Sequence, residues 1–111
     1  MDAPGRIYQA VSLSGTDASA AIDCTRYQLV GIYTPGTITS TAITFQASWD
    51  NSTFTTVMEV GGASAYTATI STSDFVPLKV EVFCGAQYVK LVPGSSEASA
   101  RTVVCVLRPV S

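Results

Sequence analysis

The feature that most constrains the fold is a two-residue alternation, which is clearest at positions 42–49. In this segment Ile43, Phe45, Ala47 and Trp49 alternate with small or polar residues. Successive side chains of a β-strand point to opposite faces of the sheet. The pattern therefore predicts a half-buried strand, in which Trp49 shares the face of Phe45.

A turn is expected directly after this strand, at residues 50–52. Asn51 tolerates the left-handed backbone conformation that a tight turn requires. The strand-like pattern resumes at 53–58, so the two segments predict a hairpin.

Oxygen ligands at 50–52 could also hold Ca²⁺. A calcium site needs six or more oxygens and the sequence has no acidic cluster nearby, so a plain turn is the favoured interpretation.

The alternation recurs along the chain, and no segment longer than a turn shows the 3.6-residue period of an amphipathic helix. We therefore predict an all-β chain that forms a single antiparallel β-sandwich of jelly-roll or discoidin-like type. The 111 residues fit one domain, 1–111, in which residues 1–8 could form an N-terminal arm. The expected strands, about eight in number, are 6–13, 27–33, 42–49, 53–58, 66–70, 78–83, 88–92 and 101–107.

The surface of this domain is expected to carry few charges. Charged residues make up 13% of the chain, against about 25% in an average soluble protein, whereas 14 Thr and 13 Ser supply uncharged polarity. So few charges give only weak electrostatic repulsion between copies of the protein, which favours self-association or binding to a lattice. The net charge of −2 argues against nucleic acid as a partner. The chain also lacks an apolar run of about 20 residues and a signal-peptide pattern, so we expect no membrane partner.

Enzymatic activity is not expected. The chain contains no His, so neither a Ser-His-Asp nor a Cys-His arrangement can form, and the eight acidic residues are too scattered to favour a carboxylate-pair enzyme. We expect no cofactor and no metal, since Cys24, Cys84 and Cys105 have no zinc-site spacing. Their odd number indicates reduced thiols. Cys84 and Cys105 are predicted to be small core residues, with a disulfide between them as the less favoured alternative.

Aromatic residues are the candidates for contacts with a partner or a ligand. Trp49, Tyr33 and Tyr66 are proposed as interface or ligand contacts, because aromatic side chains dominate the energetics of interfaces. Together with Tyr88 they could also form a flat platform for sugar rings. Packing in the core or at a subunit interface is the favoured interpretation of each.

The chain resembles two known families. Residues 45–54, which read Phe-Gln-Ala-Ser-Trp-Asp-Asn-Ser-Thr-Phe, and residues 87–92 resemble the framework of discoidin-like carbohydrate-binding sandwiches. The chain from 27 to 110 resembles short bacteriophage virion proteins more closely. That resemblance rests on Leu-Val-Gly-Ile at 29–32 before Pro35, the hairpin at 45–54, the Tyr-x-Lys-Leu strand at 88–91, and Ala-Arg-Thr at 100–102. Asn51 stands where these proteins usually have Gly, and Trp49 where they usually have a small residue.

The phage resemblance covers about three quarters of the chain and implies a virion protein of the capsid decoration (cement) or head-fibre type. The implied partners are the major capsid protein and copies of the chain itself, for instance in a trimer. The implied location is the capsid surface, after synthesis in the host cytoplasm. The alternative is a carbohydrate-binding module of a phage fibre or tail, with a host glycan as its partner.

Overall fold

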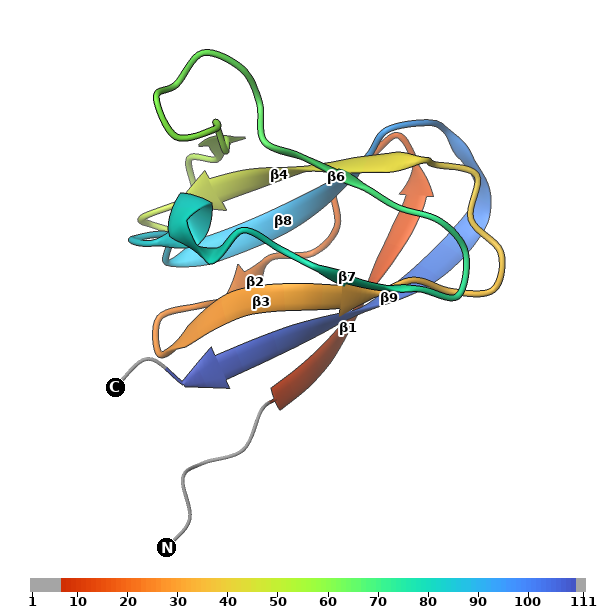
Figure 1. The fold of residues 1–111 in the computed structure, drawn as a ribbon, viewed down its shortest axis with the longest axis horizontal. Coiled ribbons are helices and arrows are strands. Elements are labelled where there is room, and N and C mark those ends of the chain that lie inside the picture. The colour runs from red at the N-terminus through yellow and green to blue at the C-terminus, as the bar shows by residue number, and fades with distance from the viewer. Residues whose placement is uncertain (1–6, 110–111) are drawn as a thin grey trace, which may run out of the picture.

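The computed structural model describes residues 7–109, which form two antiparallel β-sheets that face each other (Figure 1). Sheet 1 has the strand order β1-β9-β3-β7. Sheet 2 has the order β2-β8-β4-β5, and β6 also pairs with β4. The predicted all-β sandwich is confirmed. The elements are β1 (Ile7–Gly15), β2 (Ile22–Asp23), β3 (Tyr27–Tyr33), β4 (Ala42–Ser48), β5 (Thr55–Thr56), β6 (Thr67–Thr69), β7 (Phe75–Pro77), the 3₁₀ helix η1 (Val80–Phe83), β8 (Tyr88–Pro93) and β9 (Glu97–Pro109).

Each sheet is built around one central strand. In sheet 1, β9 pairs on one side with β1, in a register that sets Ile7 opposite Leu107, and on the other side with β3, where Tyr33 lies opposite Val104. In sheet 2, β4 pairs on one side with β8 and on the other with β5 and β6. These registers determine which side chains become neighbours on each face of the sandwich.

The core lies between the sheets, where the inward-facing residues of both sheets meet. Phe45 of β4 is fully buried, and its ring centroid lies 5.7 Å from that of Tyr66 and 5.1 Å from that of Phe83. Phe83 packs edge-on against both rings, which is a favoured geometry of aromatic pairs. Buried aliphatic residues of both sheets surround this aromatic cluster.

The alternation located the central strands correctly. The strands predicted at 27–33, 42–49 and 88–92 are confirmed as β3, β4 and β8. The predicted hairpin is confirmed by the pairing of β4 with β5, although β5 has only two residues. The turn between them holds Asn51 at a φ of 61°, the left-handed conformation expected from the sequence.

The strand predicted at 78–83 is wrong. β7 ends at Pro77, and the chain then turns into η1. The N–H of Leu78 donates to the carbonyl of Val30, and the N–H of Lys79 donates to the hydroxyl of Tyr66 at 3.0 Å. A side chain thus replaces the strand partner that a continuing ladder would need. The turn carries Phe83 into the core.

The predicted N-terminal arm at residues 1–8 overlaps β1. Ile7 and Tyr8 pair with Leu107 and Val106 of β9, so these two residues belong to sheet 1 and not to an arm. Residues 1–6 of the predicted arm lie outside the described residues. The correction places Tyr8 on a strand at the edge of sheet 1, where its side chain has a defined face.

The three cysteines are free thiols, so the alternative of a Cys84–Cys105 disulfide is wrong. Cys105 is fully buried, as predicted, and burial raises the pKa of its thiol to about 12. Cys84 was expected in the core and is exposed instead, because it follows η1 in a loop rather than lying in a strand. Cys24 is buried, and its burial raises the thiol pKa to about 11.

Glu97, at the start of β9, is a buried carboxylate that connects β9 to the segment between β3 and β4. It accepts hydrogen bonds from the N–H groups of Thr39 and Ser40, at 2.9 and 2.7 Å, and from the Ser40 hydroxyl at 2.7 Å. Arg101 Nε donates a further bond at 3.1 Å. Burial alone would raise the pKa of Glu97, but these hydrogen bonds outweigh it and lower the pKa to about 2. No pattern in the sequence indicated a structural role for Glu97.

Candidate interaction surface

The outer face of sheet 1 carries two apolar rows that cross all four strands. Val103, Cys105 and Leu107 of β9 belong to the core, so Val104 and Val106 point outwards. The strand registers continue these two positions across the sheet. The first row is Tyr8, Val106, Gly31 and Pro77, and the second is Ala10, Val104, Tyr33 and Phe75. These eight residues form the apolar face.

Three large side chains of the apolar face are open to solvent. The exposed fraction is 61% for Tyr8, 45% for Tyr33 and 48% for Phe75. The rings of Tyr33 and Phe75 contact each other, with centroids 4.8 Å apart. Val106 is 3% exposed although it lies outside the core cluster, so its neighbours on the outer face cover it. The apolar face is therefore a packed cluster and not a set of isolated side chains.

Gly31 allows the Phe75 ring to approach the sheet. A Cβ atom at this position would lie 2.6 Å from two atoms of that ring, and 3.3 Å from the carbonyl oxygen of Val76. Such contacts leave no room for a side chain, so the ring lies directly over the glycine backbone. The packing of the Phe75 ring thus explains why the Leu-Val-Gly-Ile motif at 29–32 has a glycine in this chain.

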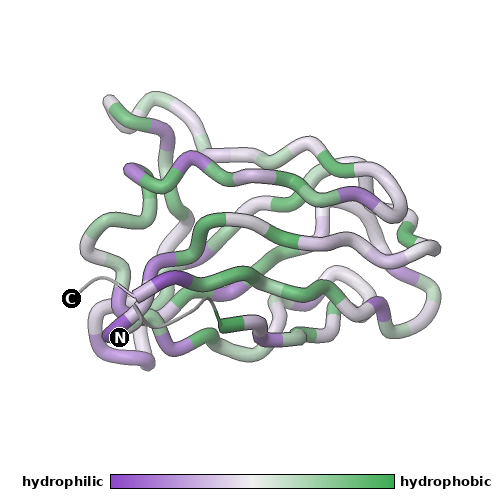
Figure 2. The backbone as a smooth tube through the Cα atoms, turned by 60° about the horizontal axis from the view of Figure 1, so that its bottom comes forward, coloured by the Kyte–Doolittle hydropathy of each residue, from purple (hydrophilic) through white to green (hydrophobic). Residues whose placement is uncertain are grey.

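Polar residues border the apolar face towards both ends of its strands. On one side Arg108 of β9 lies opposite Gln28 of β3 and donates from Nη2 to the Gln28 amide oxygen at 3.1 Å. On the other side Ser12 lies opposite Thr102. Figure 2, which turns this side of the molecule forward, shows hydrophobic segments along the middle of the strands. An apolar centre with a polar rim is the usual anatomy of a protein–protein interface.

Trp49 does not lie on the buried face of β4 as predicted, since 76% of it is exposed. β4 ends at Ser48, whose hydroxyl accepts hydrogen bonds from the N–H groups of Asp50 and Asn51 at 3.1 and 2.9 Å. The turn therefore begins at Ser48. The two-residue alternation that places Phe45 inside ends there, so it does not determine the direction of the Trp49 side chain. Burial of Trp49 in the core is excluded in the isolated domain, whereas contact with a partner stays a prediction.

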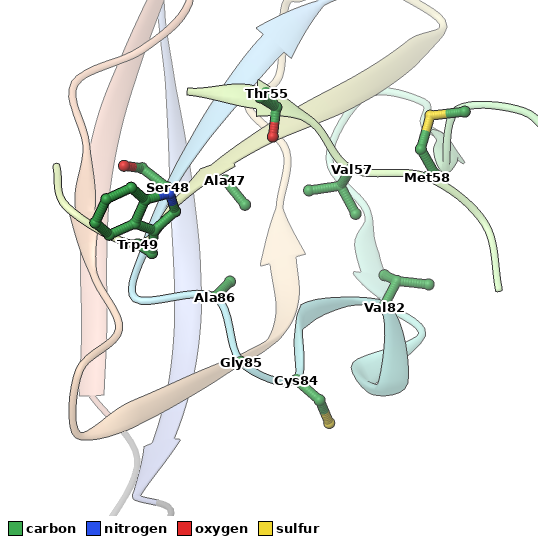
Figure 3. A pocket seen from close by; sticks show the side chains of 10 residues that line it. All are labelled: Ala47, Ser48, Trp49, Thr55, Val57, Met58, Val82, Cys84, Gly85 and Ala86. Atoms are coloured by element: carbon green, nitrogen blue, oxygen red, sulfur yellow. The ribbon is translucent and has the colours of Figure 1, made fainter. Parts of the chain in front are cut away.

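The Trp49 indole borders a shallow hollow of about 250 Å³. Figure 3 shows Trp49 at one end of the hollow and Met58 towards the other, with Cys84 pointing away. The Ser48 hydroxyl, one of the few polar groups in the lining, already donates to the Asp50 carboxylate at 2.8 Å. The remaining lining residues are Ala47, Thr55, Val57, Val82, Gly85 and Ala86. The hollow could accept an apolar or flat group, and it has no charged side chain for an ionic one.

Tyr66, the third predicted contact residue, belongs to the core. It is 7% exposed and stacks on Phe45, so it offers no contact surface in the isolated domain. Tyr33 is on the outer face of sheet 1, whereas Trp49 follows β4 of sheet 2, so the three predicted residues do not form one site. Tyr8 and Phe75 were missed. The alternation that places Val11 and Leu13 inside could have identified Tyr8 as an outward-facing residue.

The polar groups described here are occupied by structural hydrogen bonds. The Asp50 carboxylate accepts from the N–H groups of Thr53 and Ser52, each at 2.9 Å, and these bonds lower its pKa. Within residues 7–109, no three His, Cys, Asp or Glu residues gather closely enough to hold a metal ion. In the same residues, no helix has the length and apolar character needed to cross a membrane.

The fold is similar to that of a prophage-derived protein, at low sequence identity. No protein-family model and no curated protein sequence matches the chain. Among solved structures, the chain is similar to the SPBc2 prophage-derived protein YomS, with a TM-score of 0.60 and 13% sequence identity. The similarity covers 96% of this chain and 97% of that chain. At this identity it shows that the two proteins share a fold.

Proposed function

We propose that this chain is a non-enzymatic structural protein of a bacteriophage particle, and specifically a capsid decoration (cement) protein. The observation that carries the proposal is the apolar face, a contiguous uncharged patch that the isolated domain leaves partly open to water. Patches of this kind mark interaction sites in soluble proteins. The fold shared with a prophage-derived protein supports a phage origin. The low content of charged residues, 13%, suits a protein that packs on a lattice.

The proposed partner of the apolar face is the major capsid protein, at the outer surface of the capsid. Docking would remove the exposed parts of Tyr8, Tyr33 and Phe75 from water. Each Å² of apolar area that is buried contributes roughly 25 cal/mol. A protein that binds only the assembled lattice stabilises that lattice by mass action. Capsid disruption must then first break these contacts, and no chemical step is needed.

The test is the stability of particles that lack the protein. We expect them to assemble, but to release DNA at a lower temperature and under milder osmotic shock, and added purified protein should restore the thresholds. Tyr33→Ala should restore them only at a higher protein concentration, because Tyr33 is a central residue of the apolar face. Thr44→Ala, on the outer face of sheet 2, is the matched control and should act as the wild type. Particles that are equally stable with and without the protein would refute the proposal.

Carbohydrate binding by a phage fibre or tail is the second candidate function, and the exposure of Trp49 favours it. A free indole beside a shallow hollow is a suitable surface for stacking of a sugar ring. A glycan array probed with the purified domain, with Trp49→Ala as its control, tests this candidate. Particles that lack the protein and keep their stability, but fail to adsorb to host cells, would support it in place of the cement function.

A further inference from the structure

The four edges of the two sheets differ greatly in length. In sheet 2 the edge strands are β2 with two residues on one side, and β5 with two and β6 with three residues on the other. In sheet 1 one edge is β7, which has three residues and includes Pro77. The other edge is β1, which has nine residues. In the described part of the chain, β1 is therefore the long edge that could accept another strand.

β1 also lacks the features that protect natural edge strands from pairing. Such edges usually carry a Lys, a Pro or a bulge, or are very short. The sequence of β1, Ile-Tyr-Gln-Ala-Val-Ser-Leu-Ser-Gly, has no charged residue and no Pro. Its register with β9 is regular from Ile7 to Leu13, and the irregularity comes only between Leu13 and Gly15. Every second residue of a regular edge directs its N–H and C=O away from the sheet. Among residues 7–109 no strand pairs with the outer side of β1, so the edge that these residues form is both regular and open.

We propose that a second copy of this chain pairs with β1, antiparallel, with Gln9 of each copy opposite Gln9 of the other on a two-fold axis. The two four-stranded sheets would then form one continuous sheet. This pairing goes beyond the proposed function, because it does not depend on what the apolar face binds. It also predicts a dimer, in contrast to the trimer that the phage resemblance suggests.

The apolar face selects this register. Tyr8 would lie opposite Ala10 of the second copy, so both apolar rows would continue across the two-fold axis without interruption. Moving the axis to Val11 would set Tyr8 opposite Ser14, and the rows would be broken by polar residues. Moving it by one residue to Ala10 would set Tyr8 opposite Ser12, which also breaks a row. Sliding one copy past the other by a single residue would place outward-facing side chains opposite inward-facing ones. The registers centred on Ala10 or Val11 therefore lose the continuity of the two rows, which the register centred on Gln9 keeps.

The five residues around Gln9 are suited to pairing with themselves. In the proposed register, Ile7 lies opposite Val11 on the inner side of the sheet, and Tyr8 lies opposite Ala10 on the outer side. Ile7 is 39% exposed in the isolated domain, although its parity directs it inwards with Val11 and Leu13. The second copy would cover it with an apolar neighbour. No like charges meet across the axis, because residues 7–11 carry none.

The dimer should be reversible, because its contact area is small. Five paired residues extend about 17 Å along the strand, which covers far less than the roughly 800 Å² per partner of a stable interface. We expect a monomer–dimer equilibrium in the range of about 10 μM to 1 mM. Analytical ultracentrifugation of the purified domain across this range measures it. A domain that stays monomeric up to about 1 mM would overturn the proposal.

Cysteine cross-linking tests the register. Cys84 is exposed, so the variants are made in a Cys84→Ser background. Gln9→Cys should form an intermolecular disulfide with oxidised glutathione, because directly opposed strand residues have suitable Cα separations. Ser12→Cys, a matched control on the same strand, should cross-link at least tenfold more slowly. Melting temperatures verify that both variants fold. Equal cross-linking of the two, or faster cross-linking of Ser12→Cys, would overturn the register.

Other outcomes separate edge pairing from the alternatives. A dimer that Phe75→Asp abolishes, and that Gln9→Cys does not cross-link, would mean that two copies stack through their apolar faces, and edge pairing would be wrong. A trimer would overturn the two-fold axis. A domain that dimerises through Gln9 but does not bind capsids would uphold the pairing and refute the cement function. A domain that stays monomeric but restores particle stability would refute the pairing and uphold the cement function.

Discussion

The outer faces of the two sheets differ, although the strands of both sheets alternate in the same way. On sheet 1 the central outward positions form the apolar face, which has no charged residue, and Arg108 lies only at its border. On sheet 2 the central outward positions are mainly polar: Thr44, Gln46 and Lys90, with Thr67 beside them and with Val92 as an apolar neighbour opposite Thr44. The Lys90 ammonium lies 4.3 Å from the centroid of the Phe54 ring. The outer face of sheet 2 thus carries hydroxyl, amide and ammonium groups at its centre, whereas the centre of the outer face of sheet 1 is apolar.

The difference indicates which side of the sandwich is suited to contact with another protein. Hydroxyl, amide and ammonium groups lose hydration when they are covered, which costs free energy unless new hydrogen bonds form. Apolar side chains gain free energy from the same change. Core packing does not account for Tyr33 and Phe75, because the inner face of the same strands already fills the core. Their place on the outside is explained if a partner covers them.

The largest expected effect comes from placing a charge on each face in turn. Phe75→Asp would bury an unpaired carboxylate in the docked apolar face, so we expect at least about 100-fold weaker rebinding to depleted particles. Thr44→Asp should change rebinding by less than about twofold. Titration of labelled protein onto particles measures both, and melting curves verify folding. Equal effects of the two substitutions would remove the proposed difference between the faces.

Glu97 connects the first residues of β9 in sheet 1 to Thr39 and Ser40, in the segment that leads into β4 of sheet 2. Glu97→Gln should lower the free energy of unfolding by about 2 kcal/mol, because the buried donors around the carboxylate lose their charged acceptor. The folded-state pKa of about 2 lies below the ordinary value of 4.5. The stabilisation is therefore present above pH 4.5 and is lost as the pH falls towards 2. Urea unfolding between pH 7 and pH 2.5 should show this loss in the wild type and a smaller loss in Glu97→Gln.

Adjacent residues of β9 separate the inner side of sheet 1 from its outer side. Cys105→Ala should cost about 1 kcal/mol of stability through lost core packing and should leave particle binding unchanged. Val104→Ala should cost less stability and should weaken particle binding, since Val104 belongs to the apolar face. Cys84→Ala should cost almost nothing, because Cys84 is exposed. Thermal melts together with binding titrations give both quantities, and a larger stability loss for Val104→Ala would contradict the assignment of the two sides.

The smallest expected difference concerns the turn at the end of sheet 2. Asn51→Val should destabilise the domain by roughly 1 kcal/mol, because a β-branched residue is strained at positive φ, whereas Asn51→Gly should be neutral or mildly stabilising. Neither substitution should affect binding through sheet 1. Equal melting temperatures of the two variants would show that the turn does not impose this conformation in solution.

Features that depend on near neighbours along the chain could be predicted from the order of the residues. Side-chain direction in a strand is set by the local backbone, so alternation was sufficient to predict the all-β class, the strands β3, β4 and β8, and the inward direction of Phe45. The left-handed turn at Asn51 is also local, because it follows from the residues 50–52. Tyr33 was a candidate contact on the same kind of evidence, and it is exposed.

Which outward-facing residues become neighbours depends on strand order and register, and these are properties of the whole fold. Tyr8 and Phe75 are far apart in the sequence, and they share one face because β9 and β3 lie between β1 and β7 in a particular register. The prediction that Trp49 faces inwards was wrong because the Ser48 hydroxyl starts the turn one residue earlier. The strand predicted at 78–83 was wrong because the N–H of Lys79 donates to the Tyr66 hydroxyl and not to a neighbouring strand. Strand order, register and hydrogen bonds between distant residues are long-range properties, and a local alternation carries no information about them.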